Sequence, residues 1–169
     1  MKVAIIGYSG CGKSTLAGYL SELYQIPVLY LDSVFWLPGW KGRKREESAD
    51  IVKNFLDTNV SWVIDGNYSY MEYERRMEEA DRIIFLSFNR FSCLFRAFRR
   101  YFKYRGTTRE SMGEGCKEKM DMEFIWWILH EGRTKEKKEK FENIMRQYSE
   151  KSIVIKNQKQ LTRFIKESR

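Results

Sequence analysis

The sequence has few of the cysteine and histidine residues that form disulfide bonds in small secreted proteins or bind metals. Its 169 residues include three cysteines and one histidine. Cys11, Cys93 and Cys116 are an odd number at wide spacing, which argues against a disulfide framework, and a single histidine argues against a zinc site. We therefore expect a reducing, cytoplasmic compartment.

Long apolar runs are also missing. No stretch is long enough to span a bilayer, and no signal-peptide pattern opens the chain, so we expect a soluble protein without a membrane partner. The chain is 43% hydrophobic and 15% aromatic, which argues against disorder and allows a sizeable core. No repeat, low-complexity tract or long linker divides it, so residues 1–169 are predicted to form a single domain.

One glycine-rich stretch carries the strongest functional signal. Residues 7–14 read GYSGCGKS and fit the phosphate-binding pattern G-x-x-x-x-G-K-[ST]. A β-branched run over residues 2–6 precedes it and helical spacing over residues 13–25 follows it, which is the context this motif needs. Backbone N–H groups of such a loop, together with the N-terminus of the following helix, bind a polyphosphate. A glycine-rich turn that binds nothing rarely has these four fixed positions in this context.

The motif assigns roles to its residues. Lys13 is predicted to reach the β- and γ-phosphates of ATP, and Ser14 to bind Mg²⁺. Cys11 is either a thiol activated at a helix N-terminus or a small residue tolerated in the loop, and the second interpretation is favoured. The residues expected to contact the nucleotide are Gly7, Ser9, Gly10, Cys11, Gly12, Lys13, Ser14 and Thr15.

Further strands alternate with helices along the chain. This alternation predicts an α/β protein, a three-layer α/β/α sandwich with a five-stranded parallel sheet. The phosphate loop after the first strand places the site at the carboxyl edge of the sheet. The remaining strands are expected over residues 28–31, 61–65, 82–88 and 152–156.

Two aspartates end predicted strands at that edge. Asp65 lies where a phosphate-loop enzyme carries the carboxylate that organises magnesium. Asp32 either orients or deprotonates an acceptor hydroxyl, or caps a turn. Trp36, Trp40 and Tyr68 follow these strands and either stack on a ring of the acceptor or pack within the protein.

The net charge of +8 is concentrated in one stretch. Residues 90–109 contain six arginines and one lysine but no acidic residue. Helical spacing over 90–104 predicts an apolar side and a basic stripe with Arg96, Arg100 and Lys103. The apolar side comprises Phe91, Leu94, Phe95, Phe98 and Phe102.

Glycines that follow this helix indicate a flexible segment. A second helix is predicted over residues 117–131. We therefore expect a mobile lid over about residues 90–132, edged with arginines. Arg100, Arg105 and Arg109 lie beside the flexible part and are candidates for stabilising charge in a transition state.

The order of these signals resembles the nucleoside-monophosphate-kinase-like branch of phosphate-loop proteins. More narrowly, the chain is similar to the adenylate-kinase-related DNA topology modulation proteins (FlaR-like). The likeness is carried by IIGYSG at 5–10, WVIDGNY at 62–68, RGTTR at 105–109 and GCKEK at 115–119. It covers essentially the whole chain and implies a phosphate-loop fold with an arginine-rich lid. By position, it also implies that Asn157 and Gln158 lie near the adenine.

The chain departs from adenylate kinases proper at one place. Those enzymes carry Asp-Gly-Phe-Pro-Arg, whose arginine holds the monophosphate, whereas residues 65–69 here read DGNYS. Arg75 and Arg76 come too late to match by position. Asp32 instead resembles the carboxylate that shikimate kinases place at the end of the second strand, near the acceptor.

These observations favour an ATP-dependent phosphotransferase with Mg²⁺ and a small nucleotide-like or hydroxylated acceptor. The alternative is a nucleic-acid-binding ATPase or regulator that affects DNA topology, with residues 90–109 on the DNA phosphates. A polynucleotide kinase would combine the two. The basic stretch falls where a kinase lid belongs, so the ATP site can account for it.

Overall fold

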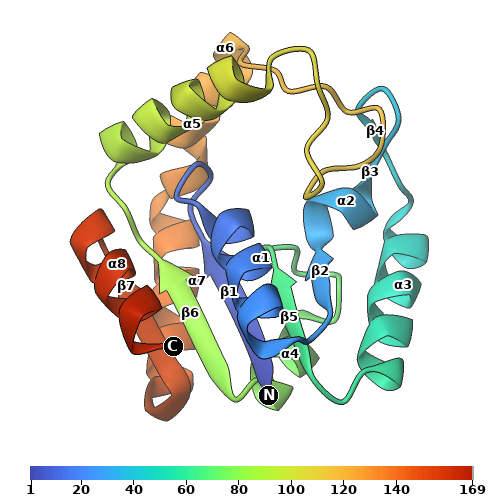
Figure 1. The fold of residues 1–169 in the computed structure, drawn as a ribbon, viewed down its shortest axis with the longest axis vertical. Coiled ribbons are helices and arrows are strands. Elements are labelled where there is room, and N and C mark those ends of the chain that lie inside the picture. Colours follow the sequence, from blue (N-terminus) through green and yellow to red (C-terminus); the bar gives the residue numbers. More distant parts are fainter. Residues whose placement is uncertain (169) are drawn as a thin grey trace.

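Residues 1–168 are described by the computed structural model, in which a five-stranded parallel sheet runs in the order β2-β5-β1-β6-β7 (Figure 1). The strand count and the parallel pairing are those predicted. The strands are β1 (Lys2–Gly7), β2 (Val28–Tyr30), β5 (Trp62–Asp65), β6 (Arg82–Leu86) and β7 (Ser152–Ile155).

The central strands are almost continuously apolar. Ala4, Ile5 and Ile6 in β1, like Ile64 in β5 and Ile84 in β6, are fully buried. Strands read this way when helices cover both faces of a parallel sheet. The register aligns Ile5 of β1 with Asp65 at the end of β5 and with Ile84.

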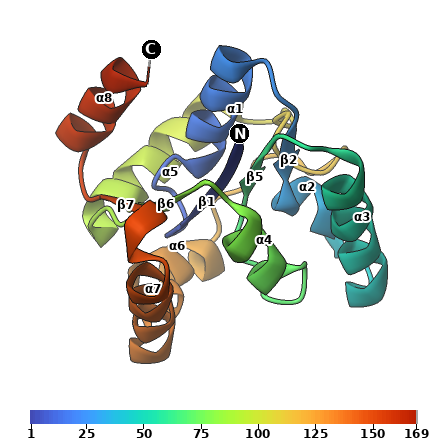
Figure 2. The ribbon, with the colours of Figure 1, turned by 90° about the horizontal axis from the view of Figure 1, so that it is seen from below.

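Helices form the two outer layers, as Figures 1 and 2 show. Helices α1 (Lys13–Tyr24) and α8 (Gln158–Glu167) cover one face, while α4 (Tyr73–Glu79) and α7 (Lys135–Gln147) cover the other. Phe141 of α7 stacks on Phe85 of β6 with ring centroids 4.7 Å apart. The predicted three-layer sandwich is therefore confirmed.

The segment between β2 and β5 covers the edge of the sheet. It contains α2 (Leu31–Phe35), an antiparallel hairpin of β3 (Trp36–Leu37) and β4 (Lys41–Gly42), and α3 (Arg45–Thr58). The aromatic stretch after β2 thus includes a short hairpin.

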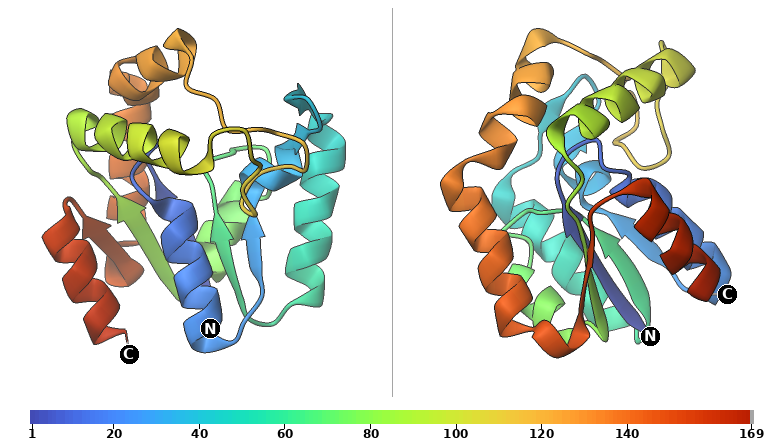
Figure 3. Two further views of the ribbon diagram at one scale, coloured as in Figure 1. Left: turned by 45° about the horizontal axis from the view of Figure 1, so that its top comes forward. Right: turned by 90° about the vertical axis from the view of Figure 1, so that its left-hand side faces the viewer.

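Two helices lie beyond the carboxyl ends of the strands (Figures 1 and 3). They are α5 (Arg90–Tyr104) and α6 (Met122–Leu129), and a 3-10 turn (Glu131–Arg133) joins α6 to α7. The second helix is shorter than predicted because Asp121 caps it, its Oδ1 accepting from the Phe124 N–H at 2.9 Å. Within residues 1–168, no helix has both the length and the apolar content needed to cross a bilayer.

The apolar side of α5 is largely exposed. Its aromatic stripe points outward, with Phe91 72%, Phe95 64% and Phe102 70% exposed, whereas Cys93 and Ala97 face the domain and are fully buried. Small side chains are needed there because the helix approaches the phosphate loop so closely that a Cβ on Gly10 would lie 2.5 Å from the Cys93 carbonyl oxygen. Helical spacing shows which residues share a face and does not show what covers that face.

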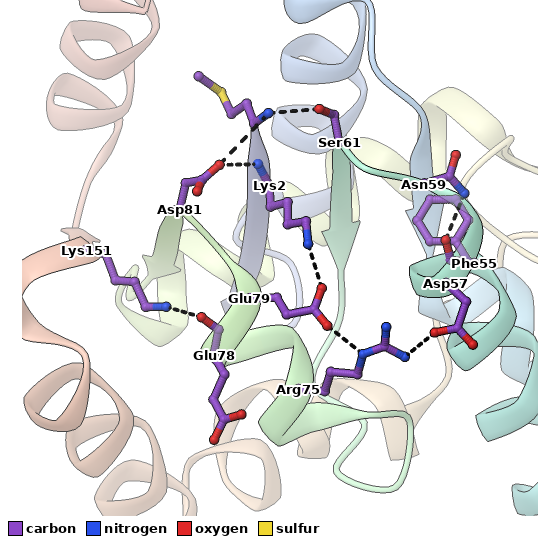
Figure 4. A network of polar contacts seen from close by, with 11 residues as sticks. Lys2, Phe55, Asp57, Asn59, Ser61, Arg75, Glu78, Glu79, Asp81 and Lys151 are labelled. Atoms are coloured by element: carbon purple, nitrogen blue, oxygen red, sulfur yellow. Dashed lines mark hydrogen bonds and ion pairs between the residues drawn. The ribbon is translucent and has the colours of Figure 1, made fainter.

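Charged side chains link helices to the sheet at the edge opposite the carboxyl ends of the strands (Figure 4). Lys2 Nζ lies 2.7 Å from the Glu79 carboxylate, and Arg75 contacts both Glu79 at 2.6 Å and Asp57 at 2.7 Å. Hydrogen bonds from Lys2 and Arg75 lower the pKa of Glu79. This network connects β1, α4 and the last turns of α3.

We expect Glu79→Gln to lower the free energy of unfolding by about 1 kcal/mol at neutral pH. The lowered folded-state pKa means that the carboxylate's contribution is complete above its ordinary pKa and is lost as the pH falls through the folded value. Urea unfolding of both proteins at several pH values tests this. Glu167→Gln, which removes an exposed partner of Arg163, serves as the control and should leave stability unchanged. A Glu79 variant that matched the wild type at neutral pH would contradict the prediction.

Candidate active site

A cleft of about 1530 Å³ opens at the carboxyl edge of the sheet. Its walls come from the phosphate loop, the loop after β5, the β3–β4 hairpin and the two helices α5 and α6. Sites for one small ligand usually measure about 300–1,000 Å³. This cleft therefore has room for two substrates.

The phosphate loop has the backbone that its glycines allow. Gly7 and Gly10 have φ values of 145° and 80°, in the region that favours glycine. A Cβ on Gly7 would lie 2.4 Å from the Leu86 carbonyl oxygen. The loop is therefore packed against β6 and α5 through backbone atoms.

Side chains from four other elements hold the loop in place. The Tyr8 ring contacts Phe85 and Phe141, and the Arg133 guanidinium lies 3.8 Å from its centroid. Trp127 Nε1 of α6 donates to Ser9 Oγ at 3.2 Å. The loop is thus fixed before any ligand binds.

Two loop side chains point back at the backbone. Lys13 Nζ donates to the Tyr8 carbonyl at 3.3 Å. The Cys11 thiol is fully buried and donates to the same carbonyl at 2.6 Å. Burial raises the pKa of Cys11 to about 11, so the thiol is protonated at neutral pH. This agrees with the interpretation of Cys11 as a small structural residue.

Ser14 and Asp65 meet beside the loop. The Ser14 hydroxyl donates to Asp65 Oδ2 at 2.7 Å, and within the described residues Asp65 Oδ1 is buried without a hydrogen-bond partner. Burial, with the nearby Asp32 charge, raises the pKa of Asp65 to about 6 against the opposing effects of Lys13 and Ser14. Buried polar atoms without a partner are uncommon and point to an absent ion or water.

These oxygens fit a magnesium ion, which prefers oxygen ligands and usually retains contacts to water and substrate phosphates. Residues 1–168 contain no group of three or more histidine, cysteine or acidic side chains that could hold a metal by themselves. A cation at Ser14 and Asp65 would therefore depend on the phosphates of a bound nucleotide.

Asn67 joins the loop after β5 to the phosphate loop. Its Nδ2 donates to the Gly7 carbonyl at 2.8 Å, and its Oδ1 accepts from the Gly7 N–H at 3.1 Å. Sequence reasoning gave Asn67 no role. The sequence signal that could have pointed to this role is an asparagine directly after the Asp-Gly pair that ends the strand.

Arg76 is fully buried behind the same loop. It donates to the carbonyls of Gly66, Tyr68 and Met71 at 3.2, 2.8 and 2.8 Å. Burial lowers its pKa to about 10. It does not line the cleft, so it shapes the loop rather than binding a phosphate there.

Asp32 lies in the first turn of α2 and lines the cleft. Its Oδ1 accepts from the Tyr68 hydroxyl at 2.8 Å. Burial and the Asp32 charge both raise the pKa of Tyr68, so this hydroxyl stays protonated. Tyr30, rather than Asp32, is the N-cap residue of α2, so the geometry favours a role in the cleft over turn capping.

Two of the three candidate lid arginines converge on one buried carboxylate. Arg100 Nε and Arg109 Nε lie 2.6 and 2.7 Å from the Glu118 carboxylate oxygens, and all three residues line the cleft. Arg105 is exposed, and its guanidinium lies 6.0 Å from the Tyr101 ring centroid, outside the cleft lining. Glu118 was missed, although the sequence shows it as an acid following a strongly basic stretch.

Arg96 reaches the phosphate loop more directly than the three candidates do. Its Nη1 donates to the Cys11 carbonyl at 3.0 Å, and its Nη2 hydrogen-bonds Gln158. Gln158 and Thr15 line the cleft, whereas Asn157 caps α8 by accepting from the Gln160 N–H. Of the two residues expected near the adenine, Gln158 therefore lines the cleft and Asn157 does not.

The loop of residues 105–121, which we call the roof loop, joins α5 to α6 and rests on the hairpin (Figure 3). The Cys116 thiol donates to the Leu37 carbonyl at 3.2 Å, and Trp40 Nε1 donates to the Lys117 carbonyl at 3.1 Å. A Cβ on Gly113 would lie 1.8 Å from the Trp36 carbonyl oxygen. The roof loop therefore packs on the hairpin backbone.

Comparisons with known proteins agree with the fold. No family model matches the chain. A shikimate kinase from Flavobacterium johnsoniae is 58% identical over 31 residues, which is 18% of each chain, so the match spans less than a fifth of that relative.

Solved structures give a likeness over nearly the whole chain. A shikimate kinase from Bacteroides thetaiotaomicron superposes with a TM-score of 0.51 and 18% identity, covering 99% of this chain and 95% of that one. A gluconokinase from Sinorhizobium meliloti gives 0.51 and 15%, covering 99% and 88%. The predicted phosphate-loop fold is confirmed, while the narrower resemblance to DNA topology modulation proteins remains a prediction.

The buried Asp65 carboxylate predicts a pH-dependent stability. Because its folded-state pKa is raised, the folded protein binds this proton more tightly than the unfolded chain does. The stabilisation that comes from this raised pKa is complete below the ordinary pKa of an aspartate. The free energy of unfolding then falls by about 2–3 kcal/mol as the pH rises to about 6. Asp65→Asn should lack this decrease.

Urea unfolding without metal or nucleotide, for both proteins from about pH 4 to about pH 7, measures the difference. Subtracting the two curves removes the contributions of other acidic groups. Parallel curves would contradict the assignment of a raised pKa to Asp65.

Proposed function

We propose that this protein is an ATP-dependent phosphotransferase that moves the γ-phosphate of Mg-ATP to a hydroxyl of a small acceptor. One observation carries the proposal. The Ser14–Asp65 pair beside the phosphate loop and the Asp32 carboxylate line the same cleft, which is large enough for two substrates. The likeness to small-molecule kinases in fold is consistent with it.

The phosphate loop would hold the nucleotide. Its backbone N–H groups surround the phosphates, and Lys13 leaves the Tyr8 carbonyl to neutralise the β- and γ-phosphates. Ser14 and Asp65 would hold magnesium, which neutralises phosphate charge when bound. The remaining loop contacts come from Gly7, Ser9, Gly10, Cys11, Gly12 and Thr15.

Asp32 would act on the acceptor. The acceptor hydroxyl oxygen forms a bond to the γ-phosphorus, the bond from that phosphorus to the bridging oxygen of ADP breaks, and Asp32 takes the hydroxyl proton. The hydrogen bond from Tyr68 fixes the carboxylate for this role.

Arg100 and Arg109 would stabilise the transferring phosphoryl group. In the absence of phosphates, Glu118 is the anion that both contact. A γ-phosphate in the cleft would compete with Glu118 for the two guanidinium groups. Arg96 would contact the bound nucleotide, because it lies beside the phosphate loop and already donates to the Cys11 carbonyl.

The basic stretch supports this function more than it supports DNA binding. Arg96, Arg99, Arg100, Lys103 and Arg109 all line the cleft. A DNA-binding surface would instead present these side chains together on the outside of the protein.

ADP release from Mg-ATP tests the function. We expect one class of small hydroxylated acceptor to stimulate release by the wild-type protein and not by Lys13→Ala. The panel contains nucleosides, nucleoside monophosphates, polyols with and without a carboxylate, 5′-hydroxyl oligonucleotides and duplex DNA. Stimulation by DNA alone, or binding without turnover across the panel, would overturn the proposal.

The lid arginines should differ in their effects. Arg100→Ala and Arg109→Ala are each expected to lower kcat about 10³-fold, because an arginine on the transferring group is worth roughly 10³–10⁵ in rate. Arg105→Ala is the matched control, since this side chain lies outside the cleft lining, and it should stay within a few-fold of the wild type. Equal effects of all three substitutions would show that the cleft geometry does not select the catalytic arginines.

A further inference from the structure

We propose that the acceptor part of the cleft binds a nucleoside, meaning a flat base attached to an uncharged, hydroxylated sugar. This proposal rests on the phosphotransferase function proposed above and names its acceptor class. It is carried by the arrangement of rings and charges around Asp32.

Five aromatic rings form a continuous wall from the hairpin to the loop after β5. Consecutive ring centroids are 5.4 Å apart for Trp40–Trp36, 4.7 Å for Trp36–Phe35, 5.3 Å for Phe35–Tyr68 and 5.9 Å for Tyr68–Tyr70. All five side chains line the cleft. We call this set the aromatic wall.

The wall does more than fill the interior. Trp36 and Trp40 lie outside the buried hydrophobic core and the residues packed on it. Aromatic faces bind flat rings by stacking, and one stacked base contributes about 1–3 kcal/mol. A saturated sugar acid offers only C–H groups to such a face and no π system, so the wall favours a base.

The charges near the wall favour a neutral acceptor. Lys119 pairs with Asp121 at 3.0 Å and lies over the Trp40 ring, and Arg45 lies 5.3 Å from the Tyr70 ring centroid. Of these two cations, Lys119 already faces a carboxylate and Arg45 faces a ring. The Asp32 carboxylate, in the same part of the cleft, would repel a second anion.

Asp32 connects the wall to the chemistry. Tyr68 belongs to the wall and also donates to Asp32 Oδ1. Among residues 1–168, no side chain or backbone group donates to Asp32 Oδ2, which is therefore available to a ligand hydroxyl. A base on the wall would place its sugar beside Asp32, with a hydroxyl directed toward the γ-phosphate.

Isothermal titration of the full chain without ATP tests the proposal separately from turnover. The probes are purine and pyrimidine nucleosides, their 5′-monophosphates, and shikimate and gluconate as carboxylated polyols. At least one nucleoside should bind, and its monophosphate and the polyols should bind at least about tenfold more weakly.

Variants then locate the binding site. Trp36→Leu should weaken nucleoside binding about tenfold or more, in line with the loss of one stacking partner, and Trp40→Leu provides a second wall variant should the first not fold. Trp126→Leu is the matched control because this exposed tryptophan of α6 lies outside the cleft lining. It should leave binding unchanged.

The outcomes separate this proposal from the function on which it rests. The nucleoside proposal would be overturned if no nucleoside bound, or if a monophosphate or a polyol bound more tightly than every nucleoside. It would also be overturned if both wall variants were folded and bound nucleoside as tightly as the wild type. A polyol that is phosphorylated while nucleosides are not would overturn it and leave the kinase function standing. A nucleoside that binds the wall, with no acceptor of the panel phosphorylated, would leave the binding site standing and overturn the kinase function.

Discussion

The structure depends on one unfavourable arrangement, a carboxylate buried at the end of a central strand. Asp65 ends β5, beside the central strand β1, and its charge is compensated by the nearby Lys13 charge, by the Ser14 hydroxyl and by the Arg109 charge. A buried charge with incomplete compensation is costly. Such a cost is tolerated at functional sites. Here a bound cation and its phosphates would supply the missing compensation of the Asp65 charge.

The surrounding loops are held so that this arrangement survives. Arg76 satisfies backbone carbonyls of the loop after β5, and Asn67, which belongs to that loop, hydrogen-bonds both the N–H and the carbonyl of Gly7, the first residue of the phosphate loop. Neither residue has a chemical role in the proposed reaction. They keep two segments, distant in sequence, in one geometry, as catalytic sites need preorganised groups.

Much of the fold and part of the candidate site could be predicted from the sequence, and the features that could not be predicted share one cause. The sheet, its parallel pairing and the phosphate loop follow from local patterns, since the β-branched runs and the glycine spacing constrain the backbone directly. The outward face of α5 and the pairing of Arg100 and Arg109 with Glu118 depend on contacts between segments far apart in sequence. Residue type and spacing predicted a lid edged with arginines, but only the tertiary packing separates Arg105 from the two that enter the cleft.

The roof loop has a consequence for the lifetime of any complex formed beneath it. Two hydrogen bonds and the Gly113–Trp36 backbone contact join it to the hairpin that carries part of the aromatic wall. If the roof loop covers a bound ligand, that ligand would leave only after these contacts separate. Dissociation is then timed by the opening of a protein segment, and ligands of different affinity would be released at rates more similar than their equilibrium constants suggest.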